Sequence, residues 1–183
     1  LEGIQIWKET KPHLTEDAIY ARARRLCEMT ITQGTLAIRS HVDISDPELG
    51  AVRALGRLRE DLKPWMTIQL VAFPQDGFFR LAEAPALRGR ALDMGLDMVG
   101  GIPHYERTTL PGGESVEALF RLAADRGLAI DMHCDETDDP ASRHIETMAG
   151  GRAVAPVATC LSYTPPSPRD RTKTGKPPSA CNK

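Results

Sequence analysis

Apolar positions recur with helical spacing in five stretches of this chain. The first helix is expected to begin after Thr15, a capping residue, and to stop at Gly34. The second is expected to open at Asp46, with Pro47 in its first turn. The other three are expected at residues 81–94, from Gly112-Gly113 to Gly127, and from Asp139-Pro140 to residue 148.

Short apolar runs between these helices predict four strands, at residues 36–43, 67–73, 97–101 and 128–133. Strands that alternate with helices imply parallel pairing and right-handed crossovers. Four such units make about half of a (β/α)8, or TIM-like, barrel, because a whole barrel takes about 250 residues. A small doubly wound sheet shows the same alternation, and periodicity alone does not separate the two. We expect an α/β fold with alternating β/α units, a partial barrel of about four strands.

The chain changes character near residue 151. Residues 152–183 contain six prolines and six lysines or arginines against one acid, and they lack apolar periodicity. Such a segment buries too little apolar surface to offset the entropy lost on ordering it. Residues 153–160 are apolar enough for a fifth strand, but Pro156 argues against one. We expect a partial barrel over residues 1–151 and an irregular Pro- and basic-rich tail over 152–183, disordered or translated out of frame.

Composition and charge narrow the class of protein. The 183 residues are 41% hydrophobic and 26% charged, which is typical of a soluble globular chain. The net charge of -2 implies neither a nucleic acid nor an anionic membrane as partner. No apolar run approaches the roughly 20 residues that span a bilayer, and the start of the chain resembles no signal peptide. Because the chain has no initiator Met, we expect that it begins within a longer sequence or was trimmed. Four cysteines without a C-x-x-C pair favour a cytoplasmic location.

Polar residues gather where the predicted strands end, which is where ligands bind in parallel α/β folds. Strand by strand, they are Arg39, His41 and Asp43; Gln75 and Asp76; His104; and His133, Asp135 and Glu136. Each has a structural alternative: Asp43 and Asp135 could cap the helices that follow them, and His104 could be a turn residue. Taken together, the cluster predicts a ligand site at this edge of the sheet.

The run His133-Cys134-Asp135-Glu136 carries the clearest chemistry. Imidazole is a good ligand for zinc or ferrous iron. A carboxylate three residues later could carry the proton of a metal-bound water to a departing nitrogen. This pairing is what hydrolysis of a C–N bond requires.

Four runs resemble the cytosine deaminase branch of the metal-dependent amidohydrolase superfamily, in order and in spacing. They are S-H-V-D at 40–43, Q-L-V-A-F-P-Q at 69–75, V-G-G-I-P-H at 99–104 and D-M-H-C-D-E at 131–136. The resemblance covers roughly residues 1–150. It implies a (β/α)8 barrel that binds one divalent metal, iron or zinc, and hydrolyses cytosine or a related heterocycle to uracil and ammonia.

The resemblance also implies roles for matching residues. His133 is similar to the third metal ligand of the family, and Glu136 to its proton-shuttling acid/base. Gln75 matches a residue that hydrogen-bonds the amide edge of a pyrimidine-like substrate, for which a carboxamide offers a donor and an acceptor. The polar neighbours expected to support these groups are His41, His104 and Asp135.

The chain departs from the family in ways that bear on activity. It has no H-x-H pair, no histidine after His144 and no counterpart of the late Asp ligand. A catalytic metal takes about three protein ligands, so we expect the chain alone to be inactive. The alternative function is a non-catalytic remnant, or a metal-free half-barrel scaffold that forms a homo-oligomer through exposed strand edges. A small binding module with accidental motif matches is a third reading, which the ordered series of matches opposes.

The loss of both family pattern and apolar periodicity near residue 151 suggests a shifted reading frame. Translating the gene in its other two frames tests this hypothesis. If neither frame restores the next barrel strand, the hypothesis fails.

Overall fold

The computed structural model describes residues 6, 9–80, 84–137, 139, 141–154 and 158–161. These residues form a parallel sheet with the strand order β1-β2-β3-β4-β5. The strands are β1 (Ala37–Asp43), β2 (Thr67–Phe73), β3 (Met98–Gly101), β4 (Ala129–Met132) and β5 (Thr159–Leu161). The helical elements are η1 (Lys11–His13), α2 (Glu16–Ile31), α3 (Gly50–Leu62), α4 (Ala84–Asp93), η2 (Pro103–Tyr105), α5 (Thr109–Arg126) and α6 (His144–Val154).

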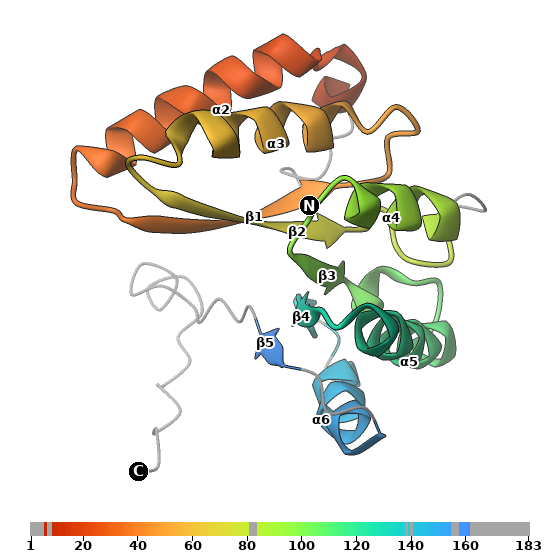
Figure 1. Ribbon diagram of the computed structural model, residues 1–183. Helices are drawn as coiled ribbons and strands as arrows, with labels where there is room; N and C mark the ends of the chain where they lie inside the picture. Colours follow the sequence, from red (N-terminus) through yellow and green to blue (C-terminus); the bar gives the residue numbers. More distant parts are fainter. Residues whose placement is uncertain are drawn as a thin grey trace, which may run out of the picture.

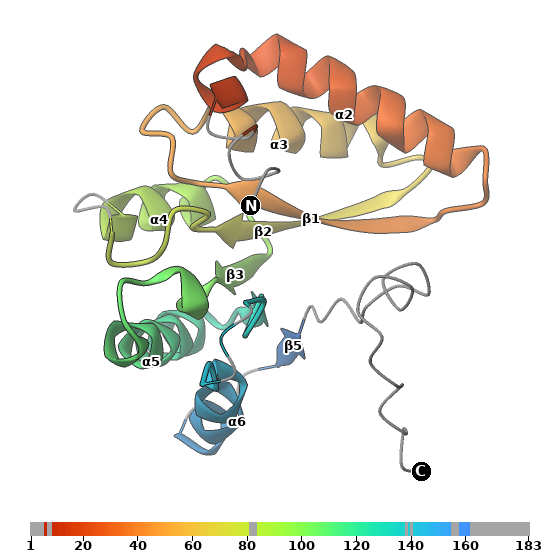
Figure 2. The same ribbon diagram turned by 180° about the vertical axis from the view of Figure 1, so that it is seen from behind.

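The helices cover only one face of the curved sheet. Each strand pairs in parallel with the strand before it, and α2 to α6 all lie along the convex side (Figure 1). The view from behind shows the same one-sided arrangement (Figure 2). A doubly wound sheet carries helices on both faces. The fold is therefore part of a TIM-like barrel, as expected, and not the doubly wound sheet that the alternation of strands and helices left open.

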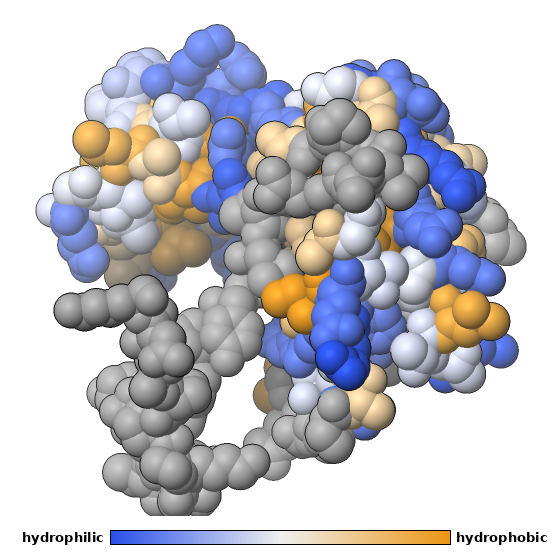
Figure 3. All heavy atoms as spheres, turned by 90° about the horizontal axis from the view of Figure 1, so that it is seen from below, coloured by the Kyte–Doolittle hydropathy of each residue, from blue (hydrophilic) through white to orange (hydrophobic). Residues whose placement is uncertain are grey.

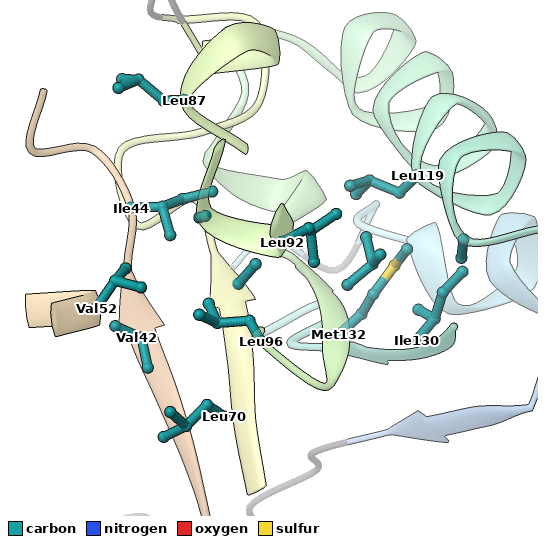
Figure 4. Close-up of a cluster of buried hydrophobic side chains, with 14 of the residues drawn as sticks. Val42, Ile44, Val52, Leu70, Leu87, Leu92, Leu96, Leu119, Ile130 and Met132 are labelled. Atoms are coloured by element: carbon teal, nitrogen blue, oxygen red, sulfur yellow. The ribbon is translucent and has the colours of Figure 1, made fainter. Parts of the chain in front are cut away.

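Alternate strand residues divide between the two faces of the sheet. The convex face carries the hydrophobic core, where strand side chains pack against helix side chains (Figure 4). Its strand residues include Val42, Leu70, Ala72, Val99, Ile130 and Met132. The alternate positions face the concave side and include Arg39, His41, Phe73, Asp131 and His133. The concave face is thus the more polar one, and it leads into the candidate site.

Several predicted boundaries are confirmed. β2 has the predicted bounds, and the side chain of Thr15 accepts a hydrogen bond from the Ala18 amide at 3.2 Å as the cap of α2. Gly127 ends α5 with a φ of 64°, a conformation that glycine adopts at little cost. Local capping chemistry was therefore a good guide at these positions.

The start of α3 was predicted wrongly. The helix begins at Gly50, not after Asp46. The Asp46 carboxylate instead accepts hydrogen bonds from the amides of Glu48 and Gly50, both at 3.0 Å, and Leu49 has a φ of 53°. The aspartate therefore closes a turn ahead of the helix. The start of α5 was also misplaced, because Gly112 and Gly113 lie within this helix.

The end of the barrel segment differs most from the prediction. α6 begins at His144, well after Asp139, and continues to Val154, past the boundary expected at residue 151. β5 then pairs in parallel with β4, so a fifth strand is present. Pro156, which argued against this strand, lies outside the described residues. The irregular tail remains a prediction for residues 162–183, which lie outside the described residues.

Candidate functional site

Three rings meet on the concave face at the carboxyl ends of three strands. His41 of β1 lies 5.0 Å from Phe73 of β2 and 4.6 Å from His133, which directly follows β4, measured between ring centroids. Phe73 and His133 lie 4.9 Å apart. The structure thus brings His41 and His133 together, although β1 and β4 are not adjacent strands.

A buried carboxylate joins the same two strands. Asp131 of β4 has a side chain only 1% exposed. Its Oδ2 accepts a hydrogen bond from Arg39 Nη1 at 2.8 Å, and its Oδ1 lies 3.2 Å from His41 Nε2. A buried charge of this kind requires such partners. The sequence prediction did not single out Asp131; an acid two residues before His133 in an otherwise apolar strand was the available signal.

Glu136 lies next to His133, as predicted. Its Oε2 is 3.6 Å from His133 Nδ1, and its side chain is 65% exposed. Burial lowers the pKa of His133, and the neighbouring His41 lowers it further, while Glu136 and Asp131 oppose the change. The imidazole is therefore neutral at pH 7 and has a lone pair available.

His104, on η2, is brought to the same region. Burial is the main cause that lowers the pKa of His104; the charges of Glu136 and Asp135 act against it, and His144 adds to it. The ring therefore lies within electrostatic reach of the H-C-D-E run. This placement agrees with a supporting position, and the assignment of His104 to the site remains a prediction.

Asp135 caps α6. It adopts a φ of 58°, and its carboxylate accepts hydrogen bonds from the Ser142 hydroxyl at 2.7 Å and from the amides of His144 and Ile145 at 2.9 and 3.0 Å. Burial alone would raise the pKa of Asp135, but these hydrogen bonds outweigh it and lower the pKa. Of the two uses that the sequence left open, the structure shows the capping one. Because Glu136 is the next residue, the cap also fixes the backbone position from which the Glu136 side chain, the candidate proton shuttle, extends.

Gln75 lies in the turn after β2 and is partly buried. Its backbone amide donates a hydrogen bond to the Phe73 carbonyl at 3.0 Å. Within the described residues, no hydrogen bond joins the Gln75 side chain to His133 or Glu136. Its expected contact with substrate therefore remains a prediction.

Lys11, which the sequence did not indicate as a site residue, bridges two carboxylates at the ends of β1 and β2. Lys11 Nζ lies 2.8 Å from Asp43 and 3.0 Å from Asp76. Burial alone would lower the pKa of Lys11, but the two carboxylates outweigh it and raise the pKa. The contact ties η1 to the turn that carries Gln75. Lys11 is distant in the sequence from Asp43 and Asp76, so no local pattern predicted these ion pairs.

Comparisons with known proteins agree with this geometry. A crystal structure of 5-methylcytosine deaminase from Klebsiella pneumoniae with phosphonocytosine matches 87% of the chain with a TM-score of 0.85 and 38% identity. N-isopropylammelide isopropylaminohydrolase from Burkholderia multivorans matches 82% of the chain with a TM-score of 0.73 and 28% identity. The N-isopropylammelide isopropyl amidohydrolase of Pseudomonas sp. strain ADP is 33% identical over 178 residues. No family model matches the sequence.

The chain is part of an amidohydrolase barrel of the cytosine deaminase type. It spans 42% of the Pseudomonas protein and 40% of the Klebsiella chain. The match to the Pseudomonas protein takes in 90% of this chain, which is more than residues 1–150. The resemblance of this amidohydrolase segment thus extends further towards the C-terminus than its motifs indicated.

The described residues of the amidohydrolase segment do not by themselves fit a catalytic metal. Among the residues that the structure describes, no group of three or more His, Cys, Asp or Glu side chains could hold a metal ion. The His133 ring contacts the ring of His41, whose Nε2 lies 3.2 Å from Asp131 Oδ1. The described residues therefore offer one candidate ligand rather than a set.

No helix in the described part is long and apolar enough to cross a membrane.

Proposed function

We propose that this chain is the substrate-binding and proton-transfer part of a cytosine deaminase-like amidohydrolase, which hydrolyses cytosine or a related heterocycle to uracil and ammonia. The observation that carries the proposal is the pair of His133 and Glu136 at the end of β4, beside the rings of His41 and Phe73. The same segment is 38% identical to a structure of 5-methylcytosine deaminase.

The proposed chemistry is hydrolysis. Water adds to the ring carbon that bears the amino group, the C–N bond breaks, and ammonia leaves. Glu136 accepts the proton of the water and delivers it to the departing nitrogen, which its exposed carboxylate is free to do. Gln75 hydrogen-bonds the amide edge of the ring. A divalent metal, iron or zinc, would need ligands from outside the described residues, so no step here depends on one.

Incubating the purified chain with cytosine and either ferrous iron or zinc tests the proposal. We expect cytosine and 5-fluorocytosine to bind without conversion, as measured by calorimetry and by uracil release. Gln75→Ala should weaken binding about 10-fold, because one or two hydrogen bonds are lost. The matched control is Gln33→Ala, in the exposed turn after α2.

Each result has a distinct meaning. Absence of binding, or equal binding by the Gln75→Ala and Gln33→Ala variants, contradicts the substrate role. Uracil release that vanishes in Glu136→Gln means that a complete metal site assembles, and the expectation of an inactive chain is then wrong. Uracil release that persists in Glu136→Gln comes from a contaminating enzyme.

The second candidate function, a self-associating scaffold, is favoured by the sheet edges. Among the described strands, β1 and β5 each have one partner, which leaves one edge of each free. Leu36, just before β1, is 76% exposed, and hydrophobic side chains appear in small groups among hydrophilic ones on the face shown in Figure 3. Free strand edges pair with other chains. Sedimentation velocity should show a dimer that Leu36→Lys weakens; a monomer at every concentration would rule this candidate out.

A further inference from the structure

Two loops at the carboxyl ends of β2 and β3 are held together by charged side chains. The loop after β2, residues 74–80, carries Gln75. The loop after β3, residues 102–108, carries His104. Arg80 Nη1 of the first loop donates a hydrogen bond to the Tyr105 carbonyl of the second at 3.0 Å, and its guanidinium carbon lies 5.4 Å from the centre of the Tyr105 ring.

A buried glutamate makes the central contact. Glu106 is 9% exposed. Its Oε1 accepts a hydrogen bond from the Phe78 amide and a second from the Phe79 amide at 3.2 Å. Bonds from backbone amides to a buried carboxylate are charge-assisted and stronger than neutral ones. The second loop therefore fixes the backbone of the first.

The turn between Gln75 and Phe78 has little freedom. At one end, the backbone amide of Gln75 donates a hydrogen bond to the Phe73 carbonyl at 3.0 Å, and the backbone amide of Gly77 donates one to the Pro74 carbonyl at 2.9 Å. Gly77 has a φ of 94°, and a Cβ there would lie 2.9 Å from Arg80 Cδ and 3.2 Å from Glu106 Oε1. Glycine is thus needed for this close approach. Gln75 lies between the end of β2 and the glutamate contact.

A buried arginine balances the charge of Glu106. Arg88 of α4 is 2% exposed, and its guanidinium carbon lies 3.7 Å from the centre of the Phe78 ring. Burial lowers the pKa of Arg88 to about 10, while Glu106 acts in the opposite direction. The Arg88 guanidinium thus stacks on the ring of Phe78, the residue whose backbone amide donates a hydrogen bond to Glu106. Ring and backbone of Phe78 are both anchored.

We propose that Glu106 is a positioning residue for Gln75: its carboxylate holds residues 75–79 so that the carboxamide is presented to the heterocycle. The inference rests on the proposed function for the substrate role of Gln75. It adds a residue in a different loop, which touches backbone amides rather than substrate.

The first test needs no ligand. Amide hydrogen exchange and the heteronuclear NOE of the Gln75 side-chain NH2 group are measured in Glu106→Leu, Glu106→Gln and the control Glu114→Leu, which changes an exposed residue of α5. In Glu106→Leu, exchange at Phe78 and Phe79 should be at least about 10-fold faster and the Gln75 NOE lower. Glu106→Gln keeps an acceptor oxygen and should restore most of both. Unchanged exchange in β2 shows that each variant is folded.

The second test measures cytosine binding in a double-mutant cycle. Glu106→Leu and Gln75→Ala should each weaken binding about 10-fold, and the double variant should lose little more, because both changes remove the same contact. Additive losses, or a Gln75 NOE that Glu106→Leu leaves unchanged, would overturn the inference. If the unchanged chain does not bind cytosine, the proposed function fails, and the Gln75 NOE still decides whether Glu106 positions the carboxamide.

Discussion

Replacing Gly112 by alanine should destabilise the fold by about 3 kcal/mol, the upper end of what overpacking costs. A Cβ at this position would overlap His144 Nε2 and lie 2.8 Å from the Pro103 carbonyl oxygen. His144 is 5% exposed, and its Nδ1 lies 3.2 Å from both Asp135 and Ser142, so a turn of its ring would break these contacts. Urea unfolding followed by circular dichroism measures the loss.

The adjacent glycine is the matched control. A Cβ at Gly113 would meet nothing nearer than Thr147 Cγ2 at 3.9 Å. Because alanine is favoured over glycine within a helix by up to about 1 kcal/mol, Gly113→Ala should be neutral or stabilising. Equal stabilities of the two alanine variants would contradict the close packing of α5 against α6.

Asp135→Ala should destabilise the fold by about 2 kcal/mol, because it removes a helix cap and hydrogen bonds to a charged group. The three donors that lose the Asp135 carboxylate are the Ser142 hydroxyl and the amides of His144 and Ile145. Asp135→Asn should cost less, since its side-chain oxygen still caps the helix. The control Asp139→Ala changes an exposed carboxylate in the preceding turn, whose loss should cost less than Asp135→Ala. Thermal unfolding of the variants checks the order.

The contribution of Asp135 should also depend on pH. Burial alone would raise its folded-state pKa, but hydrogen bonding outweighs burial and lowers this pKa below its ordinary value of 3.8. A lowered folded-state pKa gives stability that is fully present above the unfolded-state pKa and is lost as the pH falls through the folded-state value. The stability difference between the unchanged protein and Asp135→Asn should therefore be constant near neutral pH and shrink below about pH 4. A difference that stays constant down to pH 2 would contradict this.

The sequence predicted the elements better than their ends. Alternating apolar runs gave β2 its bounds, and Thr15 and Gly127 acted locally as cap and stop. The starts of α3, α5 and α6 were misplaced, because their true limits depend on contacts distant in sequence or on turn geometry. Asp135 caps α6 from nine residues away, a distance that no local capping rule covers.

The candidate site was predicted only in part, because it too depends on contacts that are distant in the sequence. Strand-end polarity correctly indicated that His41, His133 and Glu136 would lie near one another. Asp131 and Glu106 were given no role, since each bonds to groups that are distant in the sequence. An acid in an apolar segment is ambiguous until its partners are known.

The order of the strands bears on how the chain is made. Each strand from β2 to β5 pairs with the one synthesised just before it, and nascent chains fold from the N-terminus while about 5–20 residues are added each second. The β1–β2 pair can therefore form before β3 has emerged from the ribosome, and each later strand meets an edge that already exists. In a translation product that stops after β2 or a later strand, every strand already made has a described neighbour with which to pair.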